Sequence, residues 1–318
     1  MLGIDTGSYA LKFCLSEAQG EDFALRRVGE FVLLSERKAP LTSEGIRLFF
    51  QRNRLPREVT LSFSHPRMVF QRVSLPEMSQ EELENTLQWE ARSLIPDEEN
   101  FQVSWSVVGK NSGKMEVLFA AVPLQEVERY VDVFSRAGVR VEAVEPHVTS
   151  LVKGFLGLHP EFFEQAFTLV DIGFEKTTLI CFANHHILLS RSFSWGMKRL
   201  WDTLSEEFHL SPVEAFEVLR RGEGTAGIPY QLEEAIPLTS PDLVSELKRS
   251  FAFFQAEFGV RVLEQVFLSG GGALCRPLRK HVAQGLSLDF QTLRPITLGK
   301  DSIASERFLA ALGASLWK

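Results

Sequence analysis

Two short segments of this 318-residue chain place an aspartate two positions before a glycine, each at the end of an apolar run. The first is Asp5-Thr6-Gly7 and the second is Asp171-Ile172-Gly173. Glycine lets successive backbone N–H groups come close to an anion, so a turn of this kind can hold a phosphate. Because aspartate repels phosphate, the role that we expect for Asp5 and Asp171 is to hold Mg²⁺, directly or through its water molecules. Either motif alone is also compatible with an ordinary β-turn.

A lysine and a run of glycines extend this candidate phosphate site. Lys12 lies on the strand expected to return from the first turn, where it would add a positive charge. A later apolar run ends in Gly270, Gly271 and Gly272 before an expected helix. Three consecutive glycines disfavour a helix start, so the backbone there must pass close to another group. That group is either part of a nucleotide or the neighbouring strand.

The elements that must position these residues follow an α/β pattern, in which short apolar runs alternate with stretches of helical period. Capping boxes predict one helix after Ser79, ending before Pro96, and a second helix after Ser211. A third helix is predicted to begin at Ser240, because the preceding residues 221–239 are rich in glycine and proline and read as a surface loop. Residues 109–114 predict a hairpin turn.

The two Asp-x-Gly motifs also form a weak internal repeat. Each ends a strand and precedes a turn and another strand, and 171 − 5 = 166 positions separate the two aspartates, about half the chain. Two similar lobes that face each other are the simplest inference.

Composition restricts the function classes. With 34 Lys and Arg against 41 Asp and Glu, and a net charge of −7, the chain has no basic surplus for nucleic acid. The 45% hydrophobic content excludes a disordered chain. The three cysteines form no CxxC pair, which favours a reducing cytoplasm over a disulfide framework or a zinc site. We expect no signal peptide and no membrane span, because no apolar run approaches the required length of roughly 18 residues.

The order of the three motifs resembles the nucleotide cleft of the actin, Hsp70 and sugar-kinase superfamily. A more specific resemblance, to the FtsA-like PilM family of type IV pilus machines, spans almost the whole chain. It is carried by Arg72-Val73-Ser74-Leu75-Pro76-Glu77-Met78-Ser79, Glu81-Glu82-Leu83, Trp89-Glu90-Ala91, Ile95-Pro96, Ala120-Ala121-Val122-Pro123, Ala137-Gly138-Val139, Arg191 and Trp195-Gly196-Met197.

The resemblance implies a two-lobed actin-like fold of the FtsA type, with duplicated RNase H-like subdomains and an inserted 1C subdomain. It places subdomain 1A at 1–71 and 142–166, subdomain 1C at 72–141, subdomain 2A at 167–200 and 260–318, and subdomain 2B at 201–259.

The resemblance also implies bound ATP and Mg²⁺. Glu217 and Arg220 would flank the base and ribose, although their i, i+3 spacing is equally that of a surface ion pair. The residues expected to bind the cofactor are Asp5, Gly7, Ser8, Tyr9, Lys12, Asp171, Gly173, Thr177, Thr178, Glu217, Arg220, Gly270, Gly271 and Gly272, with Asp5 and Asp171 at the metal. Phe174 and Glu175 depart from the small residues of many relatives; the first would crowd the phosphates and the second would repel them.

The implied role is a cytoplasmic scaffold at the inner membrane. It would grip the N-terminal peptide of a PilN-like membrane protein between subdomains 1A and 1C, and link it to the motor ATPases and the platform protein. His65 and His147 are expected to cap or pack, and no residue pattern predicts a catalytic base, so we expect at most slow ATP hydrolysis. Two alternatives remain: a degenerate scaffold without nucleotide, in a pilus or a GspL-like secretion system, and a small-molecule kinase of the superfamily.

Overall fold

A computed structural model describes residues 1–19, 22–32, 41–96, 100–222, 229–259 and 263–316. Its first lobe is built on a five-stranded sheet in the order β3-β2-β1-β4-β8. The antiparallel strands are β1 (Leu2–Thr6), β2 (Ala10–Gln19) and β3 (Asp22–Val32), and β4 (Glu58–Phe63) and β8 (Arg140–Pro146) continue from β1 in parallel. Helices α1 (Ser43–Asn53) and α3 (Leu124–Arg136) supply Phe49, Phe50 and Phe134 to the core of this lobe.

The second lobe repeats this plan on a four-stranded sheet in the order β11-β10-β9-β12. Strands β9 (Phe167–Ile172), β10 (Thr177–Ala183) and β11 (His186–Phe193) are antiparallel, and β12 (Val266–Ser269) runs parallel to β9. Strands β9 and β10 are buried along their whole length because helices cover both of their faces, which explains their continuous apolar sequence. The predicted repeat of two α/β lobes is confirmed.

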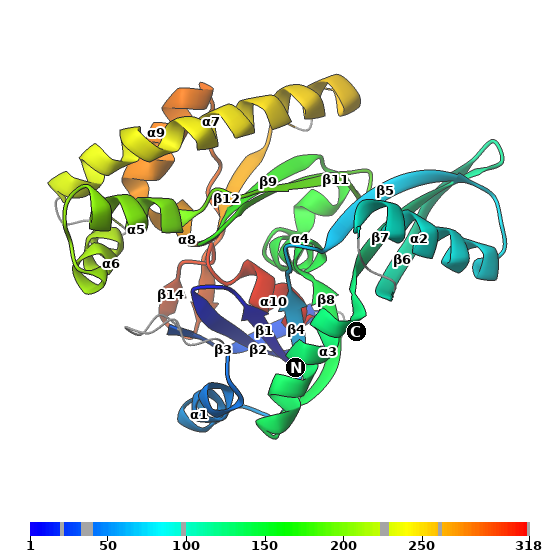
Figure 1. Cartoon of the computed structure of the whole chain (residues 1–318), viewed down its shortest axis with the longest axis horizontal. Coiled ribbons are helices and arrows are strands. Elements are labelled where there is room, and N and C mark those ends of the chain that lie inside the picture. The colour runs from blue at the N-terminus through cyan, green and yellow to red at the C-terminus, as the bar shows by residue number, and fades with distance from the viewer. Residues whose placement is uncertain (20–21, 33–40, 97–99, 223–228, 260–262, 317–318) are drawn as a thin grey trace.

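Helices α4 (His147–Leu158) and α10 (Leu309–Ser315) lie at the centre of the molecule, between the two sheets (Figure 1). They cross very closely, because glycines stand where they meet: a Cβ on Gly154 would lie 2.0 Å from the carbonyl oxygen of Leu309, and a Cβ on Gly313 1.8 Å from that of Ser150. The lobes are therefore joined through packed backbone as well as through the chain connection.

A three-stranded sheet in the order β5-β7-β6 projects from the first lobe (Figure 1). It consists of β5 (Val69–Pro76), β6 (Phe101–Asn111) and β7 (Lys114–Pro123), with α2 (Gln80–Leu94) packed on it through Leu83, Leu87 and Ala91. This unit lies between β4 and β8 in sequence, where subdomain 1C is expected, and the predicted hairpin at 109–114 joins β6 to β7. The assignment of residues to the four subdomains stays a prediction.

The outer layer of the second lobe contains α5 (Met197–Glu206), α6 (Pro212–Arg221), α7 (Tyr230–Phe258) and α9 (Arg276–Leu286), with the single-turn α8 (Gly271–Leu274) after β12 (Figure 1). The remaining elements are a 3-10 turn, Pro160–Glu164, and the hairpin of β13 (Ile296–Leu298) and β14 (Asp301–Ile303). No helix in the described part of the chain is long and apolar enough to cross a membrane.

Two predicted helices are confirmed with their capping boxes: Ser79 with Glu82 begins α2, and Ser211 with Glu214 begins α6. The prediction for the third helix is wrong at its start. Helix α7 begins at Tyr230, so residues 230–239 are helical, whereas residues 223–228 of the expected loop lie outside the described part.

Helix α7 continues through Pro237 and Pro241 although proline removes a backbone donor. Burial of Leu232, Ala235 and Ile236 extends its apolar stripe toward the N-terminus and outweighs that cost. Trp195 adds a side-chain anchor by donating its indole N–H to the carbonyl of Thr239 at 2.9 Å.

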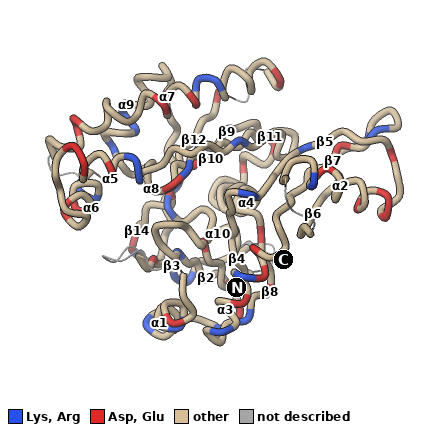
Figure 2. The backbone as a smooth tube through the Cα atoms, viewed as in Figure 1, with Lys and Arg blue, Asp and Glu red and all other residues tan. Residues whose placement is uncertain are grey.

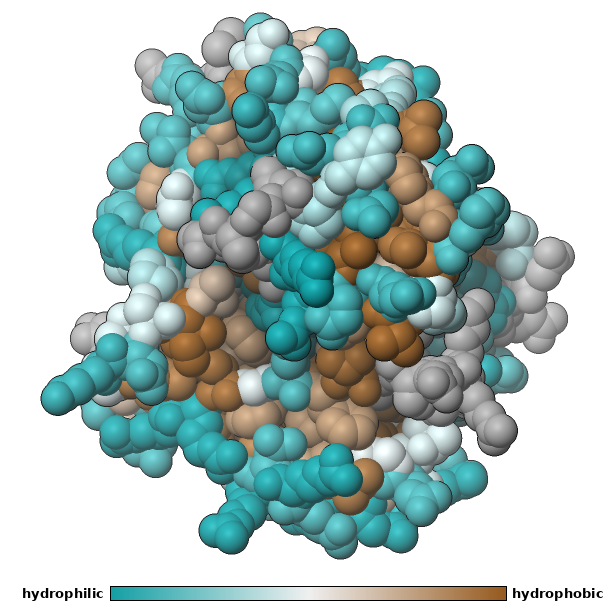
Figure 3. Space-filling view, turned by 90° about the vertical axis from the view of Figure 1, so that its left-hand side faces the viewer, coloured by the Kyte–Doolittle hydropathy of each residue, from teal (hydrophilic) through white to brown (hydrophobic). Residues whose placement is uncertain are grey.

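Basic and acidic residues are interspersed along both lobes (Figure 2). The side of the molecule that carries α6 shows several separate hydrophobic clusters between hydrophilic side chains (Figure 3). A charged ligand site must therefore be formed by a local group of side chains.

Candidate functional site in the cleft between the lobes

A cavity of about 690 Å³ lies between the lobes and is lined by residues of both. Its central residues follow the carboxyl ends of parallel strands: Gly7 follows β1, Ser64 follows β4 and His147 follows β8 in the first lobe, while Gly173 and Gly270 follow β9 and β12 in the second. Carboxyl ends of neighbouring parallel strands meet at one edge of a sheet, which is where α/β proteins bind ligands. The two sheets turn these edges toward each other.

Asp5 and Lys12 form a buried ion pair at the first turn. Lys12 Nζ donates to Asp5 Oδ2 at 3.0 Å, because the antiparallel register of β1 and β2 places the two residues opposite each other. Burial opposes the charge of Lys12, but the charge and hydrogen bond of Asp5, together with the charges of Asp171 and Glu30, outweigh burial and raise the pKa of Lys12 above its usual value. Lys12 is therefore cationic at neutral pH and faces the cavity beside Gly7 and Ser8.

Asp171 is held by two donors. Ser269 Oγ donates to its Oδ1 at 2.8 Å from the neighbouring strand, and His147 Nε2 lies 3.4 Å from its Oδ2. Burial alone would raise the pKa of this carboxyl, but the hydrogen bonds from His147 and Ser269 and the charge of Lys12 outweigh it and lower the pKa of Asp171. The carboxylate is thus held ionised in the cleft.

The structure corrects the expectation that His147 merely caps or packs. Its ring lies between the two site aspartates, with Nδ1 3.8 Å from Asp5 Oδ1 in addition to the contact with Asp171. Ser62 of β4 lies 3.1 Å from the same Nδ1 and helps to orient the ring. His147 is the first residue of α4, so its position is fixed by the close crossing of α4 with α10.

The second turn is held by the start of α5. The backbone N–H groups of Met197 and Lys198 donate to the carbonyls of Gly173 and Phe174 at 3.0 and 2.8 Å. From this turn Lys176 reaches across the cleft and donates a hydrogen bond to the hydroxyl of Ser64 in the first lobe. Burial lowers the pKa of Lys176 from its usual value, and Asp171 and Glu175 only partly offset that effect.

Four of the aromatic rings in the cavity wall contact one another and connect the lobes. The ring of Tyr9, in the first turn, lies 5.3 Å from that of Phe174 and 5.9 Å from that of Phe216 on α6, and Phe174 lies 5.9 Å from Trp201 on α5. Centroid distances in this range are those of favourable aromatic pairs. Phe174, expected to crowd a phosphate, therefore lies against Tyr9 and Trp201.

The glycine triplet serves two purposes. A Cβ on Gly272 would lie 2.3 Å from Cγ2 of Ile172, and a Cβ on Gly270, which has φ +82°, would lie 2.3 Å from the carbonyl oxygen of Ile172. These two glycines therefore allow β12 and α8 to pass close to β9. Gly271 has no atom within 4 Å of such a Cβ and lines the cavity. Of the three glycines, Gly270 and Gly271 line the cavity.

The structure brings ten of the fourteen predicted cofactor residues to the cavity wall. They are Asp5, Gly7, Ser8, Tyr9, Lys12, Asp171, Gly173, Arg220, Gly270 and Gly271. Thr177 and Thr178 are fully buried instead, and their hydroxyls bond the carbonyl of Trp195 and the hydroxyl of Ser192. Gly272 packs on β9. Glu217 is exposed on α6 outside the cavity, and Phe216 takes the place expected for it.

Several cavity residues were not predicted to be functional, notably His147, Lys176 and Phe216. A signal for His147 existed: it follows a strand that ends in Glu145-Pro146, at the sheet edge that carries Asp5. Phe216 and the contact of Lys176 with Ser64 depend on how the lobes face each other, which no local pattern reveals.

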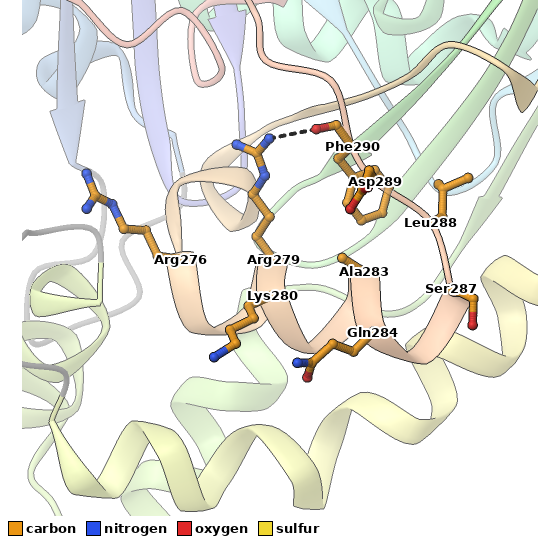
Figure 4. Close-up of a pocket in the computed structure, with 9 residues that line it drawn as sticks. All are labelled: Arg276, Arg279, Lys280, Ala283, Gln284, Ser287, Leu288, Asp289 and Phe290. Atoms are coloured by element: carbon orange, nitrogen blue, oxygen red, sulfur yellow. Dashed lines mark hydrogen bonds between the residues drawn. The ribbon is translucent and has the colours of Figure 1, made fainter.

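A second cavity, of about 570 Å³, lies beside α9 and is lined by residues 276–290 (Figure 4). Arg279 turns toward the carbonyl of Phe290 and bonds it at 3.0 Å, while Arg276 and Lys280 extend in other directions. These residues come from one helix and the segment after it, and their cations do not converge, so we assign no ligand to this cavity.

The family model described as type IV pilus assembly protein PilM matches residues 3–302. This chain belongs to the PilM family. In three dimensions it resembles the solved PilM-PilN type IV pilus biogenesis complex, with a TM-score of 0.85 and 22% identity over 99% of this chain and 97% of that chain.

The fold is shared more widely than the PilM family. MreB5 of Spiroplasma citri bound to AMPPNP has a TM-score of 0.56 at 12% identity, over 99% of this chain and 94% of that one. Ethanolamine utilization protein EutJ from Carboxydothermus hydrogenoformans has a TM-score of 0.53 at 12% identity, over 100% of this chain and 89% of that one. The predicted actin-like fold is confirmed by these likenesses.

The site of this PilM-family chain fits a phosphate better than it fits a metal bound by protein groups alone. Asp5 Oδ2 accepts a hydrogen bond from Lys12, and Asp171 Oδ1 accepts one from Ser269. The other carboxylate oxygen of each aspartate faces His147. Within the described ranges, no group of three or more His, Cys, Asp or Glu residues could hold a metal ion. Mg²⁺ prefers oxygen ligands and keeps several waters, so the two aspartates suit a metal reached through water and supported by phosphate oxygens.

Proposed function

We propose that this chain binds ATP with Mg²⁺ in the cavity between the lobes. The cavity has a volume typical of small-ligand sites. It offers the cation Lys12 and the open backbone at Gly7, Gly173 and Gly271 for phosphates, and Arg220 and Phe216 on α6 for the nucleoside. Bound Mg²⁺ would supply charge neutralisation between the phosphate oxygens, with Asp5 and Asp171 holding its waters. The fold is also that of an AMPPNP-bound protein, MreB5.

The proposed biological role is that of a scaffold in type IV pilus assembly. Membership of the PilM family carries this proposal, and the likeness to a PilM-PilN complex over 99% of the chain indicates the partner. We expect the chain to hold the N-terminal cytoplasmic peptide of a PilN-like membrane protein between subdomains 1A and 1C. It would thereby be cytoplasmic, attached to the inner membrane through that partner, and would link it to the motor ATPases and the platform protein.

Nucleotide would act on the partner through lobe closure. The cavity is lined by both lobes, so a ligand that contacts both favours the closed arrangement. A ligand shifts such an equilibrium only by its difference in affinity for the two states. ATP and the partner peptide should therefore change each other's affinity by the same factor.

Calorimetric titration with ATP and Mg²⁺, in the presence and absence of a PilN-type peptide, tests this function. Wild type is expected to bind ATP and to change its peptide affinity when ATP is present. Asp5→Ala should lose ATP binding, whereas Asp242→Ala, which removes an exposed carboxylate on α7, should retain it. Equal ATP binding by wild type and Asp5→Ala would refute the cavity as the nucleotide site.

The contacts of Tyr9 with Phe174 and Phe216 favour a second candidate, a scaffold of the same fold that binds the partner without nucleotide. These rings already join the lobes where a nucleotide would have to enter. Tight peptide binding without any heat from ATP would identify this scaffold.

A further inference from the structure

Lys176 is a half-buried cation whose charge lacks a carboxylate partner among the described residues. Within the described residues no Asp or Glu oxygen lies within ion-pair distance of its Nζ, and its hydrogen bond goes to the neutral hydroxyl of Ser64. A lysine withdrawn from water usually has a carboxylate partner, because removing a charge from water is costly. Lys12, the other lysine in the cavity wall, illustrates the usual arrangement, since Asp5 balances it at 3.0 Å. Of the two lysines in the cavity wall, Lys176 is therefore the one whose hydrogen bond could pass to an anionic group of a ligand.

The position of Lys176 indicates which part of an anionic ligand would supply that charge. The nucleoside is expected near Phe216 and Arg220 of α6 and near Gly271. Lys176 instead reaches Ser64 and lies near His65, both of which belong to the first lobe beyond the end of β4. The two groups of residues line the cavity from different lobes, so a nucleotide whose base lay at α6 would extend its phosphate chain across the cleft toward Ser64 and Lys176.

Building on the proposed nucleotide function, we propose that Lys176 binds the terminal phosphate of ATP and that Ser64 is its substitute partner while that phosphate is absent. The ammonium group would exchange a neutral hydroxyl acceptor for an anionic one. Both groups of the new contact would be charged, whereas in the contact with Ser64 only the lysine is charged, so the exchange favours the phosphate. ADP lacks that phosphate and would leave Lys176 on Ser64.

The exchange would affect the structure outside the cavity, because Ser64 begins the loop that leads from β4 into β5 of the inserted sheet. The same loop holds α3 through His65 and Arg67, which lie 3.5 and 3.1 Å from the carboxylate of Glu126. Release of Ser64 would therefore loosen the contact that ties the loop at the base of the inserted sheet to the second lobe. In this way the terminal phosphate would bias the face on which the partner peptide is expected.

The direct test compares affinities for ATP and ADP by calorimetry in wild type, Lys176→Met and Lys176→Arg. Wild type should bind ATP at least about tenfold more tightly than ADP, as expected for one added charge-assisted contact. Lys176→Met should lower ATP affinity to that of ADP and leave ADP affinity unchanged, and Lys176→Arg should keep most of the preference. Thermal unfolding checks that each variant is folded.

The outcomes separate the two proposals. ATP and ADP affinities that are the same in Lys176→Met as in wild type would overturn the role of Lys176 and leave nucleotide binding intact. Equal loss of ATP and ADP binding in Lys176→Met would also overturn it, because the lysine would then serve the whole site. If wild type binds neither nucleotide, both proposals fall.

Ser64→Ala tests the connection to the inserted sheet. This variant should bind the PilN-type peptide with the affinity that ATP-bound wild type shows, and ATP should no longer change that affinity. Coupling energies between sites commonly correspond to factors of about 5 to 150, so a shift of at least about fivefold is expected in wild type. A Ser64→Ala protein that responds to ATP as wild type does would overturn this connection.

Discussion

The carboxylate of Asp171 receives hydrogen bonds from His147 and Ser269, which lower its pKa from the usual 3.8. A carboxyl whose pKa is lower in the folded state contributes stability that is fully present above its unfolded pKa. That contribution is lost as pH falls through the lowered pKa. Acid should therefore weaken this contact between the lobes.

Asp171→Asn tests this prediction, because asparagine keeps the shape of the side chain and does not titrate. At neutral pH the free energy of unfolding of the variant should be about 1.5–3 kcal/mol lower than that of wild type, the range for hydrogen bonds to a charged group. The difference from wild type should shrink as the pH is lowered below about 4. Urea unfolding of both proteins between pH 7 and acid measures it, and a difference that stays constant with pH would contradict the prediction.

At the scale of elements, the start of α8 offers a matched pair of glycines. In Gly272→Ala the new methyl group would overlap Ile172 of β9, which should cost about 1–3 kcal/mol by overpacking. In Gly271→Ala the methyl group meets nothing within 4 Å, so stability should be unchanged. Because Gly271 lines the cavity, that variant should instead bind ATP more weakly. Thermal unfolding and calorimetry separate the two effects, and a destabilised Gly271→Ala would argue against this division.

The crossing of α4 with α10 gives a second prediction at this scale. Gly154→Ala should destabilise the protein by about 3 kcal/mol or more, because its methyl group would meet the backbone of Leu309, which cannot move without shifting α10. Gly157→Ala on the same helix is the control. Its methyl group would meet only side-chain atoms of Leu316 and Phe23, at 2.8 and 3.3 Å, and these can rotate away. Similar unfolding temperatures for the two variants would show that the crossing tolerates separation.

At the scale of the whole molecule, the rings that join the lobes compete with any ligand that must enter between them. Tyr9→Ala removes two aromatic contacts between the lobes, each worth about 0.5–1.5 kcal/mol. Because ATP must break these contacts to enter, the variant should bind ATP about tenfold more tightly than wild type. Tyr9→Phe keeps the ring and should bind ATP as wild type does. Weaker binding by Tyr9→Ala in calorimetry would mean that the ring contacts the nucleotide.

Much of the architecture follows from local patterns in the sequence. Capping boxes at Ser79 and Ser211 determine where α2 and α6 begin, since cap and first turn are adjacent in the chain. The repeated Asp-x-Gly after an apolar run predicts two similar lobes, and both sheets share the same hairpin and parallel neighbour. Helix α7 shows the limit of such patterns, because burial of its first turns outweighs the local effect of two prolines.

The sequence by itself therefore determined the α/β lobes and the two Asp-x-Gly turns, because each depends on neighbours in the chain. It also predicted ten of the residues that line the cavity, of which Arg220 came from the family resemblance. Only the tertiary structure decided what those residues meet. His147 lies between two aspartates that come from different lobes, Lys176 reaches Ser64, and Tyr9 contacts Phe216. It also decided that Thr177, Thr178 and Gly272 serve packing and that Glu217 faces outward. These contacts join residues far apart in the chain, and the close packing of α4 on α10 sets the distance between the lobes on which they depend.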